Sequence, residues 1–351
     1  MQSGGSLLVP SVQELSKENL IHVPPRYHRP QQDLIISQVH DEFPEIPFID
    51  MNNLLSQEQG DAELDKLHFA CKEWGFFQLV NHGVESTLLD KVRLEITELF
   101  NLPLSEKKKF WQSCEDFEGF GQTFVVSENQ KLDWSDVLIL FTRPIHMRKP
   151  HLFPNFPLPL RDTLELYLEE LKNVAMTIIA HMAKVLESKE ILEVFEDGMQ
   201  MMRVNYYPAC PEPEKVIGLT PHSDGAGVTI LLQLNEVEGL QIRKHGKWLP
   251  IKPLPNAFIV NIGEMLEIVT NGIYKSIEHR AMVNSSKERM SFATFLFPKY
   301  DGVLGPASTL VNQNTQAQYK TTGVKDHLKG FFGRKLDGKS YVDSKRVHHN
   351  N

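Results

Sequence analysis

Two side chains that can bind a metal stand at the entrance to an apolar strand pattern. The stretch "IGLTPHSDGAGVTILLQ" ends in an apolar, β-prone run, and His222 and Asp224 lie just before it. In an extended segment, residues i and i+2 share a face, so the imidazole and the carboxylate point the same way. This placement predicts a metal site at the mouth of a barrel. The alternative is a solvated turn that leads into a strand.

A histidine two positions before an acidic residue is weak evidence by itself. The chain has 14 histidines and 45 acidic residues among 351, so about two such pairs are expected by chance. The second pair, His40 and Glu42, lies in a polar N-terminal arm without a third ligand or a barrel strand. We interpret that pair as solvated surface that binds nothing.

His279 is the candidate third ligand, because it lies within the strand pattern "YKSIEHRAMVN". A histidine inside a strand is more often a hydrogen-bonded core residue than a ligand. Two histidines and one carboxylate on one face of a metal, however, form the triad that holds Fe(II) in non-haem oxygenases. The same set also suits zinc, so a zinc hydrolase stays open at this point.

A candidate anion site follows ten residues after His279. Arg289 begins the strand pattern "RMSFATFLF", which is apolar on both faces, and a buried unpaired charge is costly. Ser291 shares a face with Arg289, so a guanidinium fork and a hydroxyl can together bind a carboxylate. In "RVNYYPAC", Arg203, Asn205 and Tyr207 share another face, and the phenol of Tyr207 offers a further donor.

The elements that position these residues are helices in the first half of the chain and short strands in the second. Strand patterns include "IPFIDMNNLL", "FFQLV", "AFIVNIG" and the hairpin "GLQIRKHGKWLPI", which turns at 244–247 with Gly246 at positive φ. The stretch 110–159 looks irregular. An antiparallel β core buttressed by helices is expected. Helical spacing predicts helices at residues 12–20, from 64 to a stop at Gly75, 86–100, 160–188 and 314–332.

Bulk composition favours a soluble protein over a nucleic-acid-binding or membrane protein. The net charge is −8 and 41% of the residues are hydrophobic, which gives no basic footprint for nucleic acid. No apolar run is long enough to span a bilayer, and no signal peptide is visible. Three widely spaced cysteines, Cys71, Cys114 and Cys210, favour a reducing compartment. We expect a cytoplasmic monomer that acts on a small molecule.

Together these motifs identify a family. "NYYPAC", "HSD", "EHR" and "RMS", in this order and spacing, and "KEWGFFQLVNHGV" further upstream, closely resemble plant 2-oxoglutarate/Fe(II)-dependent dioxygenases over about residues 46–341. "SLLVPSVQEL", "DFEGFGQ", "KLDWSD", "RKPHLFP" and "RKLDGKSY" resemble its senescence-related-gene group. That group includes opiate O-demethylases and an enzyme named as a norcoclaurine synthase.

The resemblance implies a mainly β fold with flanking helices around a double-stranded β-helix, or jelly roll. It implies a helical and strand region at 45–195 after an arm at 1–44, the jelly-roll core at 196–300, and a C-terminal helix and tail at 301–351. It also implies that the enzyme uses Fe(II), 2-oxoglutarate and O2, with ascorbate as a supporting reductant. The implied product is a hydroxylated or O-demethylated plant alkaloid or phenolic.

The resemblance also assigns roles to residues. Iron would be held by His222, Asp224 and His279. The distal carboxylate of 2-oxoglutarate would be held by Arg289 and Ser291, with Tyr207 assisting and Asn205 nearby. Substrate contacts are expected from aromatic and apolar residues: Phe120, Phe124, Leu138, Leu140, Phe295 and Phe297.

Phe297 is the most informative departure from the family pattern, because relatives usually carry a polar residue there. A phenyl ring offers a substrate only its face and edge. We therefore expect a neutral or weakly cationic aromatic substrate with an apolar or methoxylated end near Phe297. A 2-oxoglutarate-independent oxidase of the same superfamily and an inactive ligand-binding relative also remain open.

Overall fold

Strands from both halves of the chain form the core of the computed structural model, which describes residues 6–18, 20–30, 45–113 and 116–347. The larger sheet is antiparallel except where β1 runs parallel to β2. Its described strands, in spatial order, are β1 Phe48–Asp50, β2 Phe76–Val80, β10 Phe258–Ile262, β7 Val228–Gln233, β12 Arg289–Phe297, β5 Met199–Tyr207, β4 Asp136–Arg143 and β3 Gly119–Gly121.

A smaller antiparallel sheet carries two of the candidate metal ligands. Its described strands, in spatial order, are β6 Leu219–His222, β11 His279–Ala281, β8 Leu240–Lys244 and β9 Lys247–Pro250. Two further short strands, β13 Val303–Leu304 and β14 Thr322–Gly323, pair with each other. Two β-sheets with helices outside them confirm the expected jelly-roll class.

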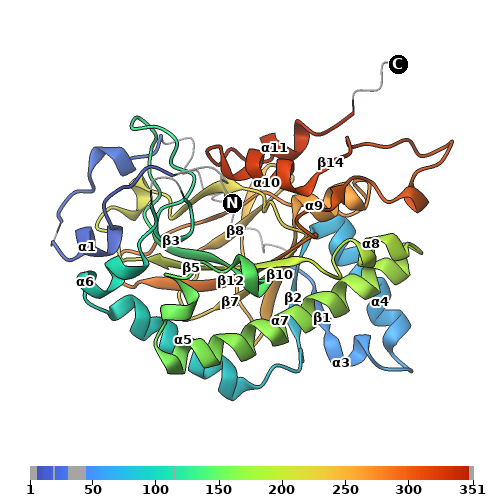
Figure 1. The fold of residues 1–351 in the computed structure, drawn as a ribbon, viewed down its shortest axis with the longest axis horizontal. Coiled ribbons are helices and arrows are strands. Elements are labelled where there is room, and N and C mark those ends of the chain that lie inside the picture. Colours follow the sequence, from blue (N-terminus) through green and yellow to red (C-terminus); the bar gives the residue numbers. More distant parts are fainter. Residues whose placement is uncertain (1–5, 19, 31–44, 114–115, 348–351) are drawn as a thin grey trace.

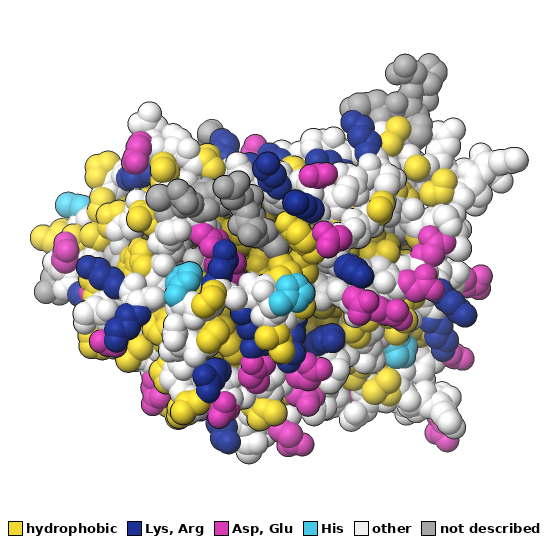
Figure 2. Space-filling model, viewed as in Figure 1, with side chains coloured by type: hydrophobic (Ala, Val, Ile, Leu, Met, Phe, Trp, Pro, Cys, Tyr) yellow, Lys and Arg dark blue, Asp and Glu magenta, His cyan; other side chains and the backbone are white. Residues whose placement is uncertain are grey.

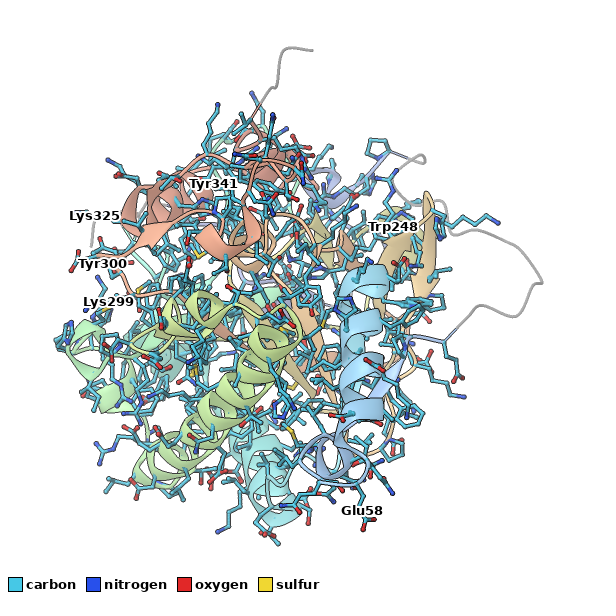
Figure 3. The ribbon with its side chains drawn as sticks, turned by 90° about the vertical axis from the view of Figure 1, so that its right-hand side faces the viewer. Glu58, Trp248, Lys299, Tyr300, Lys325 and Tyr341 are labelled. Atoms are coloured by element: carbon cyan, nitrogen blue, oxygen red, sulfur yellow. The ribbon has the colours of Figure 1, made fainter. Side chains whose placement is uncertain are left out.

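Helices cover the outer side of the larger sheet. Figure 1 shows α5 and α7 along one side of β5, β12 and β7, and Figure 3 shows α7 beside α4. Apolar residues three and four apart, such as Leu164, Leu168 and Leu171, give α7 the face that it buries. The described α-helices are α1 Val12–Ser16, α3 Met51–Leu54, α4 Gly60–Phe69, α5 Ser86–Asn101, α6 Leu104–Lys107, α7 Leu158–Val185, α8 Lys189–Glu193, α9 Glu264–Val269, α10 Val324–Phe332 and α11 Ser340–Asp343.

Two turns form where glycine was predicted to allow them. After α4, one π-helical turn ends at Gly75, which has a φ of 62°. A Cβ atom added to Gly75 would lie only 2.3 Å from the carbonyl oxygen of Lys275. Glycine alone therefore fits there. Between β8 and β9, His245 and Gly246 both have positive φ, 50° and 77°. Two such residues in a two-residue loop match the twist of a β-hairpin.

Three expectations about the elements were wrong in part, and one helix was missed. The segment "IPFIDMNNLL" was expected to be a strand, but only Phe48–Asp50 form β1, and Met51–Leu54 form the helix α3. The stretch 110–159 is not irregular throughout, because it contributes β3 and β4 to the larger sheet. The C-terminal helix begins at Val324, so residues 314–323 are not helical. The helix α9 was missed: Glu264 and Glu267 give it a mixed pattern, although all six of its residues are buried.

The described part of the N-terminal arm packs against the rest of the chain. The buried carboxylate of Asp136 on β4 accepts hydrogen bonds from the hydroxyl of Ser11 and from the backbone of Val12 and Gln13 at the start of α1. Nearby, Tyr27 packs edge-on against Trp134 with ring centroids 5.1 Å apart. These contacts hold the arm on the sheet. The pair His40 and Glu42 lies outside the described residues.

The surface carries charges of both signs. Figure 2 shows lysine, arginine and acidic side chains interspersed on one face, with small hydrophobic groups between them. Among the described residues, no helix has both the length and the apolar character needed to cross a bilayer.

Candidate active site

Neighbouring strands bring the three predicted metal ligands together. His222, the last residue of β6, pairs directly with His279, the first residue of β11, and Asp224 follows two residues after His222. The Nε2 atoms of His222 and His279 lie 3.4 and 3.6 Å from Oδ1 of Asp224. One ligand atom from each residue falls within 4.8 Å of the other two, and all three residues are buried. The group is therefore compact enough to share one ion.

Hydrogen bonds to the other atoms of these groups leave one ligand atom free on each. The Nδ1 of His222 lies 2.8 Å from the carbonyl oxygen of Thr220, and the Nδ1 of His279 lies 3.1 Å from that of Ile277. A carbonyl can only accept, so each Nδ1 donates and each Nε2 keeps its lone pair. This is the arrangement in which protein carbonyls orient histidine ligands of a metal.

The carboxylate of Asp224 is oriented in the same way. Its Oδ2 accepts hydrogen bonds from Thr229 and Asn261, both at 2.7 Å, so Oδ1 faces the two imidazoles. Burial raises the pKa of Asp224, but the histidines and Asn261 outweigh burial and hold this pKa well below its usual range. Burial, followed by the nearby His222, lowers the pKa of His279 to about 4. Two neutral imidazoles and an anionic oxygen fit Fe(II).

Arg289 is a buried cation that has no carboxylate partner among the described residues. Its guanidinium, in a residue only 2% exposed, reaches the hydroxyl of Ser291 at 3.5 Å and the amide oxygen of Gln233 at 3.4 Å. Its Cζ lies 5.2 Å from the ring centroid of Tyr207, and its Nε has no hydrogen-bond partner. Long contacts to neutral groups do not compensate a buried charge. The residues present therefore fit the carboxylate of 2-oxoglutarate.

The register of two buried strands assembles this anion site. On neighbouring strands β12 and β5, Arg289 lies opposite Tyr207 and Ser291 lies opposite Asn205. The amide nitrogen of Asn205 approaches the Ser291 hydroxyl at 3.4 Å, and its amide oxygen has no partner within the described chain. One cavity connects the anion site with the candidate metal centre. Its polar lining comprises Arg203, Asn205, Tyr207, His222, Asp224, Thr229, Asn261, His279, Arg280, Arg289 and Ser291.

A second cavity touches the candidate metal centre from the aromatic side. Three of the predicted substrate residues line it: Phe124, Phe295 and Phe297. Phe124 has a positive φ of 66°, an uncommon conformation for a bulky side chain, and its ring meets Phe331 edge-on at 5.8 Å. Apart from Arg203, His222 and Asp224, the lining of this cavity is apolar: Phe124, Ile139, Met201, Gly225, Ala226, Phe295, Phe297, Phe331, Phe332 and Leu336.

The other three predicted substrate residues are buried elsewhere. Phe120 packs edge-on against Phe100, with centroids 5.0 Å apart. Leu138 and Leu140 do not line the aromatic cavity, whereas Ile139 between them does. Neighbouring strand residues point to opposite faces, and Ile139 lies opposite Arg203 on the cavity side of β5. Ile139, and not Leu138 or Leu140, therefore lines the aromatic cavity.

Several lining residues were missed from the sequence. Met201 shares a strand face with Arg203, so strand parity could have revealed it. Phe331, Phe332 and Leu336 come from the C-terminal segment, and no local pattern connects them with the metal ligands. Their position depends on long-range contacts of that segment.

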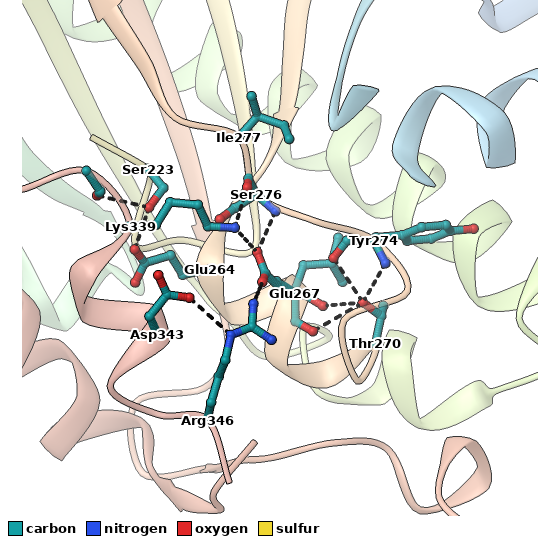
Figure 4. A network of polar contacts seen from close by, with 12 residues as sticks. Ser223, Glu264, Glu267, Thr270, Tyr274, Ser276, Ile277, Lys339, Asp343 and Arg346 are labelled. Atoms are coloured by element: carbon teal, nitrogen blue, oxygen red, sulfur yellow. Dashed lines mark hydrogen bonds and ion pairs between the residues drawn. The ribbon is translucent and has the colours of Figure 1, made fainter. Parts of the chain in front are cut away.

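The C-terminal segment is tied to the metal-ligand strand and to α9. The backbone of Gly338 bonds to the carbonyl oxygen of Pro221 at 3.0 Å and to the N–H of Ser223 at 3.3 Å. Figure 4 shows Lys339 and Arg346 converging on the fully buried Glu267, at 2.8 and 3.2 Å. This ion-pair network anchors the part of the chain that directly follows the cavity-lining residues Phe331, Phe332 and Leu336.

Comparisons with known proteins agree with this geometry. Two family models match the chain: the 2OG-Fe(II) oxygenase superfamily at residues 198–298, and the N-terminal region of non-haem dioxygenases in morphine synthesis at residues 46–156. Protein SRG1 of Arabidopsis thaliana is 57% identical, with 97% of each chain covered. Codeine O-demethylase of Papaver somniferum is 54% identical, with 98% of each chain covered.

One further relative and one solved structure are also similar to this chain. Oxoglutarate-dependent flavonoid 7-O-demethylase 1 of Ocimum basilicum is 51% identical, over 98% of this chain and 92% of the relative. The crystal structure of JOX2 in complex with 2OG, Fe and JA superposes with a TM-score of 0.90 at 37% identity, over 98% of this chain and all of that one.

Proposed function

Since the chain belongs to the 2OG-Fe(II) oxygenase superfamily, we propose that it hydroxylates or O-demethylates a small aromatic plant metabolite. Membership confirms the family resemblance and, with it, the use of Fe(II), 2-oxoglutarate and O2. Relatives named as demethylases of codeine, thebaine and flavonoids support the substrate class.

We propose His222, Asp224 and His279 as the iron ligands and Arg289 and Ser291 as the clamp for 2-oxoglutarate. The observation that carries this assignment is the free ligand atom on each of three buried side chains, all within 4.8 Å. The unpaired Arg289 lines the same cavity. When bound, iron and 2-oxoglutarate use O2 to convert a C–H bond to C–OH, with release of succinate and CO2.

The residues of this chain hold and orient the reactants. The carbonyls of Thr220 and Ile277 keep both imidazoles aimed at one point, and Thr229 and Asn261 do the same for Asp224. The phenylalanines of the aromatic cavity exclude water and stack on an aromatic substrate. If the hydroxylated carbon is a methoxy carbon, the product loses formaldehyde and leaves a phenol.

The test of this function is stoichiometric. The purified enzyme, supplied with Fe(II), 2-oxoglutarate and a panel of methoxylated flavones, phenolics and alkaloids, is expected to form one succinate for each hydroxylated or demethylated product. Product without succinate would indicate an oxidase that does not use 2-oxoglutarate. Activity that persists with zinc in place of iron would indicate a hydrolase. Ligand binding without any turnover would indicate an inactive relative.

Phe297 offers a sharper test of the substrate end. Its ring lies 6.1 Å from that of Phe141 and 6.4 Å from that of Phe295, so two further phenyl rings border it. A free phenol buried there loses its hydrogen-bond partner, which costs about 1–3 kcal/mol. Wild type is therefore expected to favour a methoxylated substrate over the matched phenol, and Phe297→Asn to shift the ratio toward the phenol. An unchanged ratio would place Phe297 outside the substrate contacts.

We also propose that the enzyme is a cytoplasmic monomer that binds neither nucleic acid nor membrane. The net charge of −8 and the mixture of charges on the visible face support this. Light scattering during size-exclusion chromatography tests whether the protein is a monomer. A fluorescent fusion expressed in plant cells tests whether it is cytoplasmic.

A further inference from the structure

The two cavities of the candidate active site are too small for an aromatic substrate. The cavity that contains Arg289 has a volume of about 50 Å³, and the aromatic cavity has a volume of about 20 Å³. Pockets that bind small organic molecules usually measure about 300–1,000 Å³. Part of the wall therefore has to move before an aromatic ring can lie beside the candidate metal centre.

Most of the wall of the aromatic cavity belongs to regular structure that resists such movement. The strands β4, β5 and β12 pair with one another in register, and they contribute Ile139, Met201, Arg203, Phe295 and Phe297. The helix α10 contributes Phe331 and Phe332. Phe124 differs from these residues, because it lies after β3 in a stretch that forms neither helix nor strand.

Phe124 also separates the aromatic cavity from a larger cavity nearer the surface. This outer cavity has a volume of about 440 Å³, and several of its lining residues, such as Asn129 and Lys131, are exposed. Phe124 and Leu336 line both cavities. The full lining of the outer cavity is 122–127, 129–133, Arg29, Thr220, Lys335 and Leu336. A substrate that crosses this partition reaches the aromatic cavity directly.

The closed position of Phe124 is held by contacts rather than by local backbone preference. Its φ of 66° lies in the left-handed region, which a bulky side chain disfavours. The ring stacks on Phe332 and meets Phe331 edge-on, both with centroids 5.8 Å apart. The backbone N–H groups of Thr123 and Phe124 donate no hydrogen bond to another described residue. Rotation at Phe124 therefore relieves strain and breaks ring contacts only.

Ser6 of the N-terminal arm fastens the backbone on both sides of Phe124. Its hydroxyl donates to the carbonyl oxygen of Gln122 at 2.8 Å and accepts from the N–H of Val125 at 3.1 Å. The N–H of Leu7 bonds to the carbonyl oxygen of Val125 at 2.8 Å. Ser6 is only 2% exposed, and Figure 1 shows the arm beside the segment that follows β3. One buried hydroxyl thus bridges the two residues that flank Thr123 and Phe124.

We infer that Phe124 is the gate through which an aromatic substrate passes from the outer cavity into the aromatic cavity, and that Ser6 is a positioning residue that keeps this gate closed. The inference rests on the proposed function and deepens it. No described residue of the arm lines the aromatic cavity. The arm thus controls how fast the substrate reaches the site without contacting the reacting atoms.

The association rate distinguishes a gate from an ordinary contact. Loss of a contact mainly raises the dissociation rate, whereas loss of a gate also raises the association rate. The probe is 2-methoxynaphthalene, an apolar and fluorescent aromatic ether. It is mixed under nitrogen with enzyme that holds Fe(II) and 2-oxoglutarate, and its fluorescence is followed by stopped flow. Phe124→Ala is expected to raise the association rate constant at least about tenfold, because an open state that is a minor conformer is populated at about 10% or less.

Variants of Ser6 test the positioning role while the ring stays in place. Ser6→Ala removes the bridge and is expected to accelerate association about threefold or more, which is the typical effect of one hydrogen bond on an equilibrium. Ser6→Thr keeps the hydroxyl and should stay within about twofold of wild type. Ser11→Ala is the matched control, because it removes another hydroxyl of the same arm, which bonds to Asp136 and not to the segment that carries Phe124.

The remaining outcomes contradict the inference. If Phe124→Ala raises only the dissociation rate, Phe124 is a contact and not a gate. If Ser11→Ala accelerates association as much as Ser6→Ala, general loosening of the arm explains the effect. Binding of the probe by neither wild type nor any folded variant also refutes the gate. Circular dichroism establishes folding, and Phe124→Gly, which suits a positive φ, replaces an alanine variant that does not fold.

The proposed function is tested separately from the gate. Succinate formation by wild type with the wider panel reports on the reaction, whereas the probe reports on entry in the absence of O2. A gated probe without succinate would refute the reaction alone, and succinate without gating would refute the roles of Phe124 and Ser6 alone.

Discussion

At the scale of single residues, the candidate site depends on which atom of each side chain is left free. His222 and His279 each use Nδ1 for a backbone carbonyl, and Asp224 uses Oδ2 for two donors. The remaining three atoms face one point. The hydrogen bonds thus set the tautomer of each imidazole before any metal arrives, which lowers the cost of arranging ligands around an ion.

Removal of one ligand atom should abolish iron binding. Asp224→Ala is expected to lose stoichiometric iron and turnover while it remains folded, because two neutral imidazoles alone bind Fe(II) weakly. Iron content and succinate formation are the measurements. The double variant of His40→Ala and Glu42→Ala is the matched control, since it removes the other histidine–acid pair and should behave like wild type. Substantial product from Asp224→Ala, or iron loss in the control, would refute the ligand assignment.

The anion clamp supports a second prediction at this scale. Breaking a buried charge pair costs roughly 3–5 kcal/mol, or about two to three and a half decades of affinity. Arg289→Ala is therefore expected to weaken 2-oxoglutarate by at least about tenfold, even after water fills the space. Calorimetry under nitrogen measures the affinity for 2-oxoglutarate directly, and the dependence of turnover on 2-oxoglutarate concentration measures the same affinity during catalysis. Arg243→Ala, at an exposed arginine on β8 that lines neither cavity, is the control and should keep the wild-type affinity for 2-oxoglutarate. An unchanged affinity in Arg289→Ala would mean that another residue holds the carboxylate.

At the scale of elements, the C-terminal segment forms one wall of the aromatic cavity although it is remote in sequence from the metal ligands. Glu267 on α9, which is fully buried, accepts from the backbone of Ser276, the phenol of Tyr319, Lys339 and Arg346. These four donors come from three separate parts of the chain. The network therefore couples α9, the loop that leads to His279, and the segment that carries Phe331 and Leu336.

Weakening this network should loosen the wall without disturbing iron. Lys339→Met removes the 2.8 Å ion pair to Glu267 and a 2.7 Å bond to the carbonyl oxygen of Ser276. The free energy of unfolding is expected to fall by roughly 1–3 kcal/mol, because the carboxylate of Glu267 and the carbonyl oxygen of Ser276 each lose a donor. Arg346 still pairs with Glu267 in this variant. Hydrogen exchange of residues 331–346 should accelerate and substrate KM should rise. Lys335→Met, at an exposed lysine of the same segment, is the control; equal exchange in both variants would exclude the coupling.

At the scale of the whole molecule, Glu118 links pH to global stability. Its carboxyl is only 3% exposed and accepts a hydrogen bond from the backbone N–H of Phe141, next to Asp116 and Lys149. Burial is the main cause that raises the pKa of Glu118 to about 7. The folded state therefore holds a proton that the unfolded chain releases near pH 4.5.

The sign of the pH dependence follows from that difference. Between about pH 4.5 and 7 the folded state binds more protons than the unfolded state, so this group makes stability fall as pH rises, by at most about 1.4 kcal/mol per pH unit. Glu118→Gln should remove that slope, so its stability relative to wild type should increase from pH 5 to pH 8. Urea unfolding at each pH measures the free energy of unfolding of both proteins. A difference between variant and wild type that does not change with pH would contradict the raised pKa of Glu118.

Local periodicity was enough to predict most of the chemistry. Side chains on a strand alternate between two faces. The sequence alone therefore predicted that Arg203, Asn205 and Tyr207 share a face, and that alternate residues from Arg289 to Phe297 share another. Spacing also predicted α5, α7 and the glycine turns, because helix formation and positive φ depend on neighbouring residues. The family, the jelly-roll fold and the cofactors followed from the same motifs.

The tertiary structure decided which faces meet. Strand alternation predicted that Leu138 and Leu140 point to the same face of β4. The register of β4 against β5 places Ile139 opposite Arg203, and this showed that the cavity lies on the opposite face of β4. No pattern near Phe331 or Leu336 could reveal that an ion-pair network at Glu267 carries them to the site. Register and long-range ion pairs join segments that are distant in the chain, so their outcome depends on the packing of the whole fold and is absent from any local repeat.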